Sequence, residues 1–391
     1  MPLSLPARLR AILEAEFPRF SETEMVHRRA AVEALLAEAG LDHLVYCGAN
    51  RTGSAVQWLT QWPVTAEAVG VFSPGRRDAL FIQYFNHLPL ARRLAEAAVE
   101  WGGESSIQAA IGELGRRGAR PGRLGVVGPM LFAQHAALSA RFGEIRDLNR
   151  ACTRLRTIKS AEEIDWIRIG AALSDRAMTA LGEGLRPGLN ERELGDLVER
   201  AYAPEGGTNV IHYFGVTPMH DPQLAVPAQF ASTRRVQKGD IVLAEIAAAF
   251  WDHPGQVLRS FAVGEQPPPL YRELHAAADA AFDAIAAVLR DGAMPSAVVA
   301  ASRVIEDAGF TTIDDLLHGY GGGYLPPILG SSSRPAGPLP NEPFKAGMTV
   351  VIQPNVATRD GKAGVQTGEL VLIKADGIER LHAVPRGLQR V

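Results

Sequence analysis

The sequence predicts an α+β protein of two domains, in which a smaller three-layer α/β domain precedes a domain of helices packed on an antiparallel sheet. The chain has 391 residues, a length typical of two domains. Up to about residue 152, helical and strand patterns alternate, which is typical of a three-layer α/β domain. Beyond this point, pairs of helices separate groups of strands. We therefore predict domains at 1–152 and 153–391.

In the first domain, short periodic segments are separated by turn residues. An amphipathic helix is expected within residues 1–20. Gly40 is a typical C-cap for the next predicted helix, which ends just before it. The further predicted helices are 22–38, 88–97, 106–117 and 131–141. The predicted strands are 43–47, 68–72, 78–83 and 124–127.

The second domain begins with a capping box, because Ser160 precedes Glu163 by three residues. This signal predicts a long helix to about Gly182, and Asn190 caps a second helix over 191–202. The later predicted helices are 268–290 and 293–308. The predicted strands are 209–214, 241–249, 260–263, 348–353, 368–374 and 380–383.

Composition excludes several classes of protein. The net charge of −3 and the 21% of charged residues imply no strong field for nucleic acid or a membrane surface. No apolar run approaches the ~18 residues of a transmembrane helix. Only Cys47 and Cys152 are present, so we expect no disulfide framework and a cytoplasmic location. Cys47 lies in an apolar strand pattern and is expected to be a buried core residue.

The C-terminal domain contains a set of polar positions that look like a metal site with its charges removed. These positions are Glu245, Gln256, His318, Gln353 and the Gly368-Glu369 pair.

Six segments around these positions resemble the creatinase/aminopeptidase P/prolidase family in order and rough spacing. They are Arg154-Leu-Arg-Thr-Ile-Lys-Ser-Ala-Glu-Glu-Ile164, Leu185-Arg-Pro-Gly-Leu-Asn-Glu-Arg-Glu-Leu194, Val236-Gln-Lys-Gly-Asp-Ile-Val-Leu243, His318-Gly319, Gly347-Met-Thr-Val-Val-Ile352 and Gly364-Val365. The resemblance covers about residues 153–391. It implies a pita-bread C-terminal domain, a creatinase-type N-terminal domain and a homodimer.

The resemblance also implies where two metal ions would be bound. The family site supplies four carboxylates and one imidazole, and the matching residues here are Glu245, Gln256, His318, Gln353 and Gly368. Two divalent cations need anionic oxygen ligands, but a glutamine offers a neutral amide and a glycine offers no side chain. We therefore expect no dinuclear site, no metal and no other cofactor. A single weak metal on Glu245, His318 and Glu369 remains an open alternative.

The residues at the replaced ligand positions favour a pocket adapted to another ligand over a pocket that has lost its function. Gln256 and Gln353 can both donate and accept hydrogen bonds, which suits a small polar ligand. Creatinase, in the same family, works without metal. The main hypothesis is therefore a metal-independent, creatinase-like hydrolase of a C–N bond in a small polar molecule. Two tightly bound divalent ions per subunit would contradict it.

The catalytic candidates either transfer protons or orient water. They are His318, His220, Glu245 and Glu369. The substrate-binding candidates are Gln256, Gln353, His212, Tyr320, Tyr324 and Arg51. His220, in a loop of proline and aspartate, is the better of the two upstream histidines, because His212 on its strand fits a core position equally well. Tyr320 and Tyr324 either line the pocket or pack in the core.

Two further hypotheses remain open. A metal-dependent Xaa-Pro peptidase with altered ligands would cleave Xaa-Pro dipeptides faster with manganese or cobalt and would lose activity with a chelator. A non-catalytic pita-bread binding module would be stabilised by ligand without turnover, and His318→Ala would leave binding largely intact.

The implied dimer leads to a prediction for Arg51. In creatinase-type dimers the N-terminal domain reaches over the active site of the partner, so Arg51 is predicted to contact substrate across the interface, with a solvated loop arginine as the alternative. Unchanged kinetics of an Arg51→Ala variant would contradict this prediction.

Overall fold

The computed structural model describes residues 3–50 and 54–391, which divide into two compact units. One unit comprises residues 15–156, and the other comprises residues 3–14 and 157–391. The division thus falls four residues later than the expected 152/153 boundary. The first helix, α1 (Ala7–Leu13), belongs to the C-terminal unit, where Arg8 forms an ion pair with Asp165. Arg51 lies outside the described residues.

The N-terminal unit is built on one six-stranded mixed sheet with the order β4-β3-β2-β1-β5-β6. The strands are β1 His43–Gly48, β2 Ala68–Phe72, β3 Ala79–Ile82, β4 Ala98–Trp101, β5 Leu124–Val127 and β6 Ile145–Asp147. The helices are α2 Glu22–Ala39, α3 Ser54–Thr60, η1 Phe85–His87, α4 Leu88–Leu94, α5 Ser106–Arg116, α6 Phe132–Phe142 and α7 Asn149–Leu155.

Side-chain alternation along β1 explains why this unit has three layers. Val45 and Cys47 pack in one cluster with buried residues of α5 and α6. Their neighbours point to the opposite face, because successive strand residues alternate. Helix α3 packs against β1, and α2 packs against both α3 and α7. The predicted three-layer α/β domain is therefore confirmed, although the short elements α3, β4, β6 and α7 were not predicted.

Cys47 is a core residue, as predicted. Its side chain is buried in β1, and burial raises the pKa of the thiol to about 12. Cys152 is also buried, and burial raises its pKa to about 11. Both thiols stay protonated at neutral pH, so neither has the character of a nucleophile.

The C-terminal unit contains a nine-stranded sheet in which β12-β11-β13-β15-β9-β8-β7 are neighbours, with β16 beside β15 and β17 beside β9. The strands are β7 Thr208–Pro218, β8 Asp240–Phe250, β9 His253–Ala262, β11 Leu317–Tyr320, β12 Tyr324–Leu329, β13 Thr349–Ile352, β15 Gly368–Ile373, β16 Ile378–Arg380 and β17 Gln389–Arg390. A separate pair consists of β10 Thr311–Thr312 and β14 Val356–Ala357.

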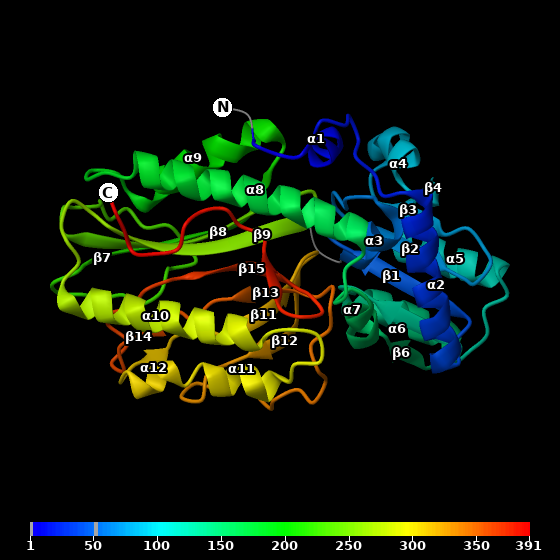
Figure 1. Cartoon of the computed structure of the whole chain (residues 1–391). Coiled ribbons are helices and arrows are strands. Elements are labelled where there is room, and N and C mark those ends of the chain that lie inside the picture. The colour runs from blue at the N-terminus through cyan, green and yellow to red at the C-terminus, as the bar shows by residue number, and fades with distance from the viewer. Residues whose placement is uncertain (1–2, 51–53) are drawn as a thin grey trace. The chain divides into compact units, whose positions relative to one another are not determined.

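Helices cover this sheet on two sides, with α8 above and α10 below in Figure 1. The helices are α8 Ala161–Gly184, α9 Glu191–Tyr202, η2 Ala203–Glu205, α10 Pro269–Val288, α11 Pro295–Ala301 and α12 Val304–Asp307. The capping box predicted at Ser160 and the helix cap predicted at Asn190 are confirmed at the starts of α8 and α9, and Asn190 also forms a capping box with Glu193. Helix α8 lies so close to β9 that a Cβ atom at Gly255 would clash with the backbone of Ala171.

Several boundaries differ from the prediction for local reasons. The glycine-rich run after His318 forms the hairpin of β11 and β12, which was not predicted. Gly321, Gly322 and Gly323 all have positive φ, which a tight turn requires and which glycine adopts without strain. Strand β9 begins at His253 rather than at residue 260, and the expected helix over 293–308 is divided into α11 and α12.

Strand register places the singled-out positions on one face of the sheet. Glu245 pairs with Leu258, which in turn pairs with Gly368. Cross-strand partners point to the same face, and so do residues two apart on one strand. Gln256 therefore shares the face of Leu258. His318 joins them through its partner Val351, which pairs with Leu370 two residues after Gly368. Glu369 necessarily points to the opposite face.

On that opposite face, Glu369 forms a buried ion-pair network. Its carboxylate accepts a hydrogen bond of 2.8 Å from Arg259 and further bonds from Arg380. Arg259 also donates to the carbonyl groups of Val384 and Pro385, which attaches the C-terminal segment to β9. The side chains of Arg259 and Glu369 are both fully buried. Burial opposes ionisation, yet the arginines hold the pKa of Glu369 below its usual value.

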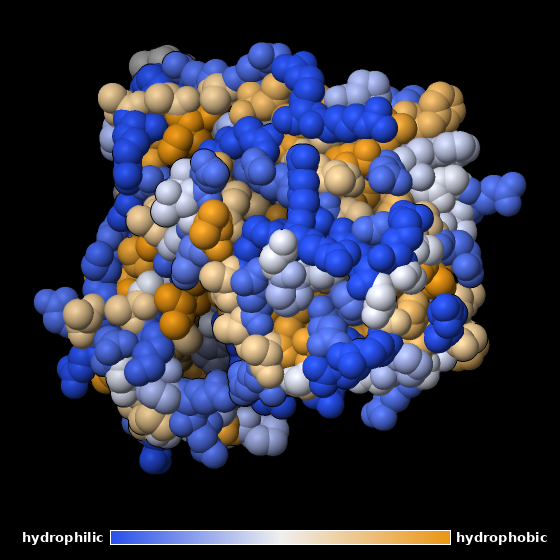
Figure 2. All heavy atoms as spheres, turned by 90° about the vertical axis from the view of Figure 1, so that its right-hand side faces the viewer, coloured by the Kyte–Doolittle hydropathy of each residue, from blue (hydrophilic) through white to orange (hydrophobic). Residues whose placement is uncertain are grey.

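No helix among the described residues combines the length and apolarity needed to cross a membrane. The face shown in Figure 2 mixes hydrophilic and hydrophobic side chains throughout.

Removing the cation from this network should destabilise the protein strongly. We expect Arg259→Met to lower the free energy of unfolding by about 3–5 kcal/mol, because buried Glu369 loses one of its two cations and the carbonyl groups of Val384 and Pro385 lose their donor. Urea denaturation measures the loss. The control is Arg200→Met, which breaks the exposed pair with Asp196 and should cost less than about 1 kcal/mol. Equal losses in the two variants would contradict the assignment.

Candidate active site

The centre of the candidate site is a glutamine that connects two other polar side chains. The Nε2 atom of Gln256 on β9 donates to Glu245 Oε1 at 2.8 Å and to Gln353 Oε1 at 3.2 Å. Gln353, directly after β13, donates through its own Nε2 to Asp315 Oδ1 at 3.2 Å. Glu245, Gln256 and Gln353 are all buried. The predicted positions Glu245, Gln256 and Gln353 therefore form one hydrogen-bonded network.

This network includes two acids that the sequence analysis did not select. Asp315 also accepts a bond of 2.8 Å from the hydroxyl of Tyr324, and Asp314 Oδ1 accepts from the backbone N–H of Asp315 at 2.8 Å. The two acids lie between β10 and β11, just before His318. Adjacent acids ahead of a strand that carries a candidate histidine were a usable signal.

Glu245 has the electrostatics of a proton acceptor at neutral pH. Burial, with contributions from the charges of Asp314 and Asp315, raises its pKa to about 7. Hydrogen-bonding groups on Gln366 and Gln256 oppose this increase. Burial and Asp315 also raise the pKa of Asp314 to about 6. A carboxyl group that titrates near the working pH is well suited to general base catalysis, and such groups cluster at functional sites.

His318 lies in the site, and its ionisation does not fit the acid part of its predicted role as general acid/base. Burial lowers its pKa to about 4, so the ring is neutral at physiological pH. Nδ1 lies 3.0 Å from the carbonyl oxygen of Gly319, which only accepts, so the proton is on Nδ1. The ring of Tyr324 stacks on the imidazole with centroids 4.0 Å apart. His318 is therefore available as a hydrogen-bond acceptor through Nε2.

The two upstream histidines do not lie with this network. His212 pairs with Ile246, so it points away from the face of Glu245, and its Nε2 is 2.9 Å from the hydroxyl of Tyr202 on α9. Tyr213 is the residue that pairs with Glu245, and sequence reasoning missed it.

His220 follows the end of β7 and lies 3.7 Å from Glu265. The end of β7, Pro218, pairs with Asp240, which is five residues and therefore roughly 17 Å along the strand from Glu245. The structure thus separates His220, the preferred upstream candidate, from the site.

The remaining predicted residues divide clearly. Tyr320 is 3% exposed and lies near enough to Glu245 for that charge to help raise its pKa, after burial as the main cause. Tyr324 is 51% exposed and covers His318. Glu369 does not belong to the site, because it points to the opposite face and is bound by two arginines. The alternative metal set of Glu245, His318 and Glu369 is thereby wrong.

Several buried polar atoms around Glu245 have no hydrogen-bond partner among the described residues. They are Gln256 Oε1, Tyr320 Oη and both amide atoms of Gln366. Gln366 lies near enough to lower the pKa of Glu245, but within residues 3–50 and 54–391 no group meets hydrogen-bonding geometry with its amide. Buried polar groups without partners are rare and costly in native structures. Their concentration here is typical of a site that receives a polar ligand.

These residues do not fit a two-metal centre. Gln256 presents an N–H donor, rather than an anionic oxygen, to Glu245 and Gln353. At Gly368 an added Cβ would lie 2.6 Å from the carbonyl oxygen of Ile352, so the neighbouring strand occupies the space of a fifth ligand. Within residues 3–50 and 54–391 no group of three or more histidine, cysteine, aspartate or glutamate side chains is arranged to hold a metal ion.

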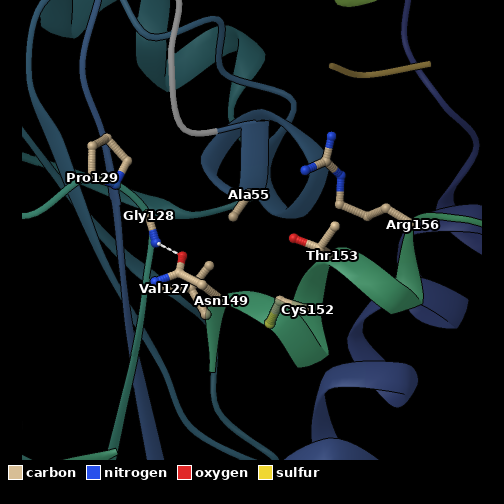
Figure 3. Close-up of a pocket in the computed structure, with 8 residues that line it drawn as sticks. All are labelled: Ala55, Val127, Gly128, Pro129, Asn149, Cys152, Thr153 and Arg156. Atoms are coloured by element: carbon tan, nitrogen blue, oxygen red, sulfur yellow. Dashed lines mark hydrogen bonds between the residues drawn. The ribbon is translucent and has the colours of Figure 1, made fainter. Parts of the chain in front are cut away.

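A cavity of about 330 Å³ also exists within the N-terminal unit (Figure 3). It lies beside the end of β5, where the N–H of Gly128 donates to Asn149 Oδ1 at 2.8 Å. Its remaining lining residues are Ala55, Val127, Pro129, Cys152, Thr153 and Arg156. The lining contains no acid or histidine, so it offers no general base.

Comparison with known proteins identifies the family. Residues 165–375, more than half of the chain, match metallopeptidase family M24. The chain belongs to this family. A Xaa-Pro dipeptidase of Pyrococcus furiosus is 25% identical over 271 residues, which cover 68% of this chain and 75% of that protein. An uncharacterized peptidase of Staphylococcus epidermidis is 23% identical, over 60% of this chain and 65% of that protein.

Solved structures of dipeptidases share the fold along nearly the whole chain. A Xaa-Pro dipeptidase from Bacillus anthracis has a TM-score of 0.80 at 20% identity and covers 94% of this chain and 100% of its own. Dipeptidase PepE from Mycobacterium ulcerans has a TM-score of 0.78 at 23% identity, with coverages of 95% and 99%. The predicted family and the predicted pita-bread architecture are confirmed, and with them the assignment to a hydrolase family.

The raised pKa of Glu245 predicts a pH-dependent cost in stability. Between its ordinary value of 4.5 and about 7, the folded state binds more protons than the unfolded state, so the free energy of unfolding falls as pH rises. Glu245→Gln removes this cost. Relative to the wild type, the variant should gain about 2–3 kcal/mol between about pH 5 and about pH 8.

Urea denaturation at both pH values measures this gain. Glu273→Gln, at an exposed position of α10, is the matched control and should show no such gain. A constant difference between Glu245→Gln and the wild type at both pH values would contradict the assigned ionisation of Glu245.

Proposed function

We propose that this protein hydrolyses the amide bond of a small peptide-like substrate, using Glu245 as the general base and no two-metal centre. The names of the relatives support a peptidase, and they favour the Xaa-Pro peptidase alternative over the creatinase-like hydrolase for the substrate. The observation that carries the metal-free part is the position of Gln256 Nε2 between Glu245 and Gln353, where two cations would need anionic oxygens.

The chemistry needs only groups of this chain and one water molecule. Glu245 takes a proton from the water, whose oxygen forms a bond to the carbonyl carbon of the substrate. The unpartnered hydroxyl of Tyr320 and the amide N–H groups of Gln366 are donors for the resulting oxyanion. When the C–N bond breaks, the protonated Glu245 returns its proton to the leaving nitrogen. The products are a carboxylic acid and an amine.

Burial of Tyr320 supports this role, because it raises the pKa of the phenol and keeps the hydroxyl protonated as a donor. The neutral His318 and Gln353 then position substrate by hydrogen bonds. His318 offers Nε2 as an acceptor, while Gln353 remains linked to Asp315.

The second candidate is a metal-dependent Xaa-Pro peptidase, which the family and the names of the relatives favour. It requires metal binding through a donor set that has lost its carboxylates. The third candidate, a binding module, would keep the ligand site without turnover. The three candidates differ in metal content and in turnover.

The decisive assay combines metal analysis with peptide hydrolysis. Protein purified without chelator should hold less than one tightly bound divalent ion per subunit by mass spectrometry. Its hydrolysis of an Xaa-Pro dipeptide such as alanyl-proline should be unaffected by chelator. The value of kcat/KM should rise with pH through about 7, as Glu245 loses its proton.

Glu245→Gln should lower kcat by about 100-fold or more, because the general base is lost. Glu273→Gln is again the control with unchanged kinetics. Two bound ions per subunit together with chelator-sensitive turnover would establish the second candidate instead. Binding of the dipeptide without any turnover would leave the third.

A further inference from the structure

We infer that the cavity of the N-terminal unit is a binding site for a small organic anion, one with a carboxylate or phosphate head and a short apolar part. The inference does not depend on the proposed function, because every lining residue belongs to the unit of residues 15–156. The cavity volume of about 330 Å³ lies at the lower end of the range of about 300–1,000 Å³ that is typical of small-molecule sites.

The cavity lies where neighbouring parallel strands of the sheet end. Strand β1 pairs with β5 in parallel, and β5 pairs with β6 in parallel, so the carboxyl ends of all three strands lie at the same end of the sheet. The lining follows these ends. Ala55 belongs to α3 after β1, residues 127–129 end and follow β5, and residues 149–156 follow β6.

The chain leaves β1 and β5 toward opposite faces of the sheet. Helix α6, after β5, packs in the cluster that contains Cys47. Helix α3, after β1, packs with α2, which also contacts α7. The layer of α2, α3 and α7 lies on the other face. A Cβ atom at Gly125 would meet the side chain of Leu148, just before α7, and Gly125 pairs with Leu44, which points away from the face of Cys47.

Such a change of direction between neighbouring strands favours a binding site. Loops that leave adjacent strands toward opposite faces open a crevice between them, and open α/β sheets bind their ligands in this crevice, outside the carboxyl ends of the strands. The cavity of the N-terminal unit occupies this place between β1 and β5.

Short contacts fix the walls of the cavity. Gly128 has a φ of 99°, and a Cβ atom there would lie 1.9 Å from the carbonyl oxygen of Cys47, so only glycine lets the ends of β5 and β1 approach each other. The N–H of Gly128 donates to Asn149 Oδ1, and Asn149 Nδ2 donates to Asp147 Oδ1, both at 2.8 Å. A site formed in advance binds its ligand with a smaller loss of entropy.

The polar side chains of the lining favour an anion. In Figure 3 the guanidinium group of Arg156 and the hydroxyl group of Thr153 both extend toward Ala55. A guanidinium group binds a carboxylate or a phosphate through two parallel hydrogen bonds. Arginine carries five N–H donors, so Arg156 can bind an anion and a protein group together.

The rest of the lining supports the same class of ligand. Ala55, Val127 and Pro129 offer apolar contacts to a short hydrocarbon part. A metal ion or an organic cation does not fit, because the lining residues include no acid and no histidine, and the Cys152 thiol stays protonated at neutral pH.

The test compares four probes of similar size that differ in charge. Isothermal titration of the full-length protein uses n-butyrate, n-butyl phosphate, neutral n-butyramide and n-butylammonium. At least one of the two anions should bind, and the tighter of them identifies the head group. The amide and the ammonium should not bind. Arg156→Gln should weaken binding of the anion about tenfold or more, because the charge is lost.

Thr153→Val is a second variant, which keeps the shape of the side chain and should weaken binding of the anion about threefold or more. It decides the question if Arg156→Gln does not fold by circular dichroism. The matched control is Arg150→Gln, at an exposed position of α7 that does not line the cavity, and it should bind the anion like the wild type.

Three results would overturn the inference. They are equal binding of n-butyramide and the anions, no binding of either anion at millimolar concentration, and binding of the anions that is unchanged in Thr153→Val and in folded Arg156→Gln. The proposed function can fail separately, because Glu245→Gln should leave binding of the anion unchanged. Binding that is lost in Glu245→Gln and kept in Thr153→Val would place the anion in the C-terminal unit and reject the cavity as its site.

Discussion

The carboxamide of Gln256 donates both of its N–H groups, one to the carboxylate of Glu245 and one to the carbonyl of Gln353. A carboxylate at this position would repel Glu245 unless cations lay between them, whereas the amide attracts it without any cation. The other features of the site depend on this bond. Glu245 can stay buried, and Gln353 is oriented toward Asp315.

Because successive side chains of a strand point to opposite faces, the two faces of the sheet carry different charged groups. On one face, Glu245 and Gln256 belong to a network of carboxylate and amide groups. On the other face, Glu369 is bound by Arg259 and Arg380. Neighbouring positions on one strand, Gly368 and Glu369, therefore have unrelated roles. The first lets the backbone of Ile352 approach, and the second supports the packing of the C-terminal segment.

The two faces also differ in their effect on stability. The arginines favour the ionised form of Glu369, which stabilises the fold at neutral pH. The surroundings of Glu245 disfavour its ionised form, which costs stability at the same pH. Such a cost is common at functional sites, where a group is held in an environment that suits its chemistry rather than the folded state.

Much of this protein could be predicted from local sequence signals. The capping residues Ser160 and Asn190, the strand around Cys47 and the order of the family segments depend on local chemistry and spacing, so they identify helices, strands and family without tertiary contacts. The replaced residues at 256, 353 and 368 likewise indicated an altered metal site. The tertiary structure decided what local signals cannot contain. Strand register turned Glu369 away and brought Tyr213 to Glu245, and a loop placed Asp314 and Asp315 beside the glutamines. Side-chain partners across a sheet are set by pairing between distant segments, and burial sets the pKa of each acid.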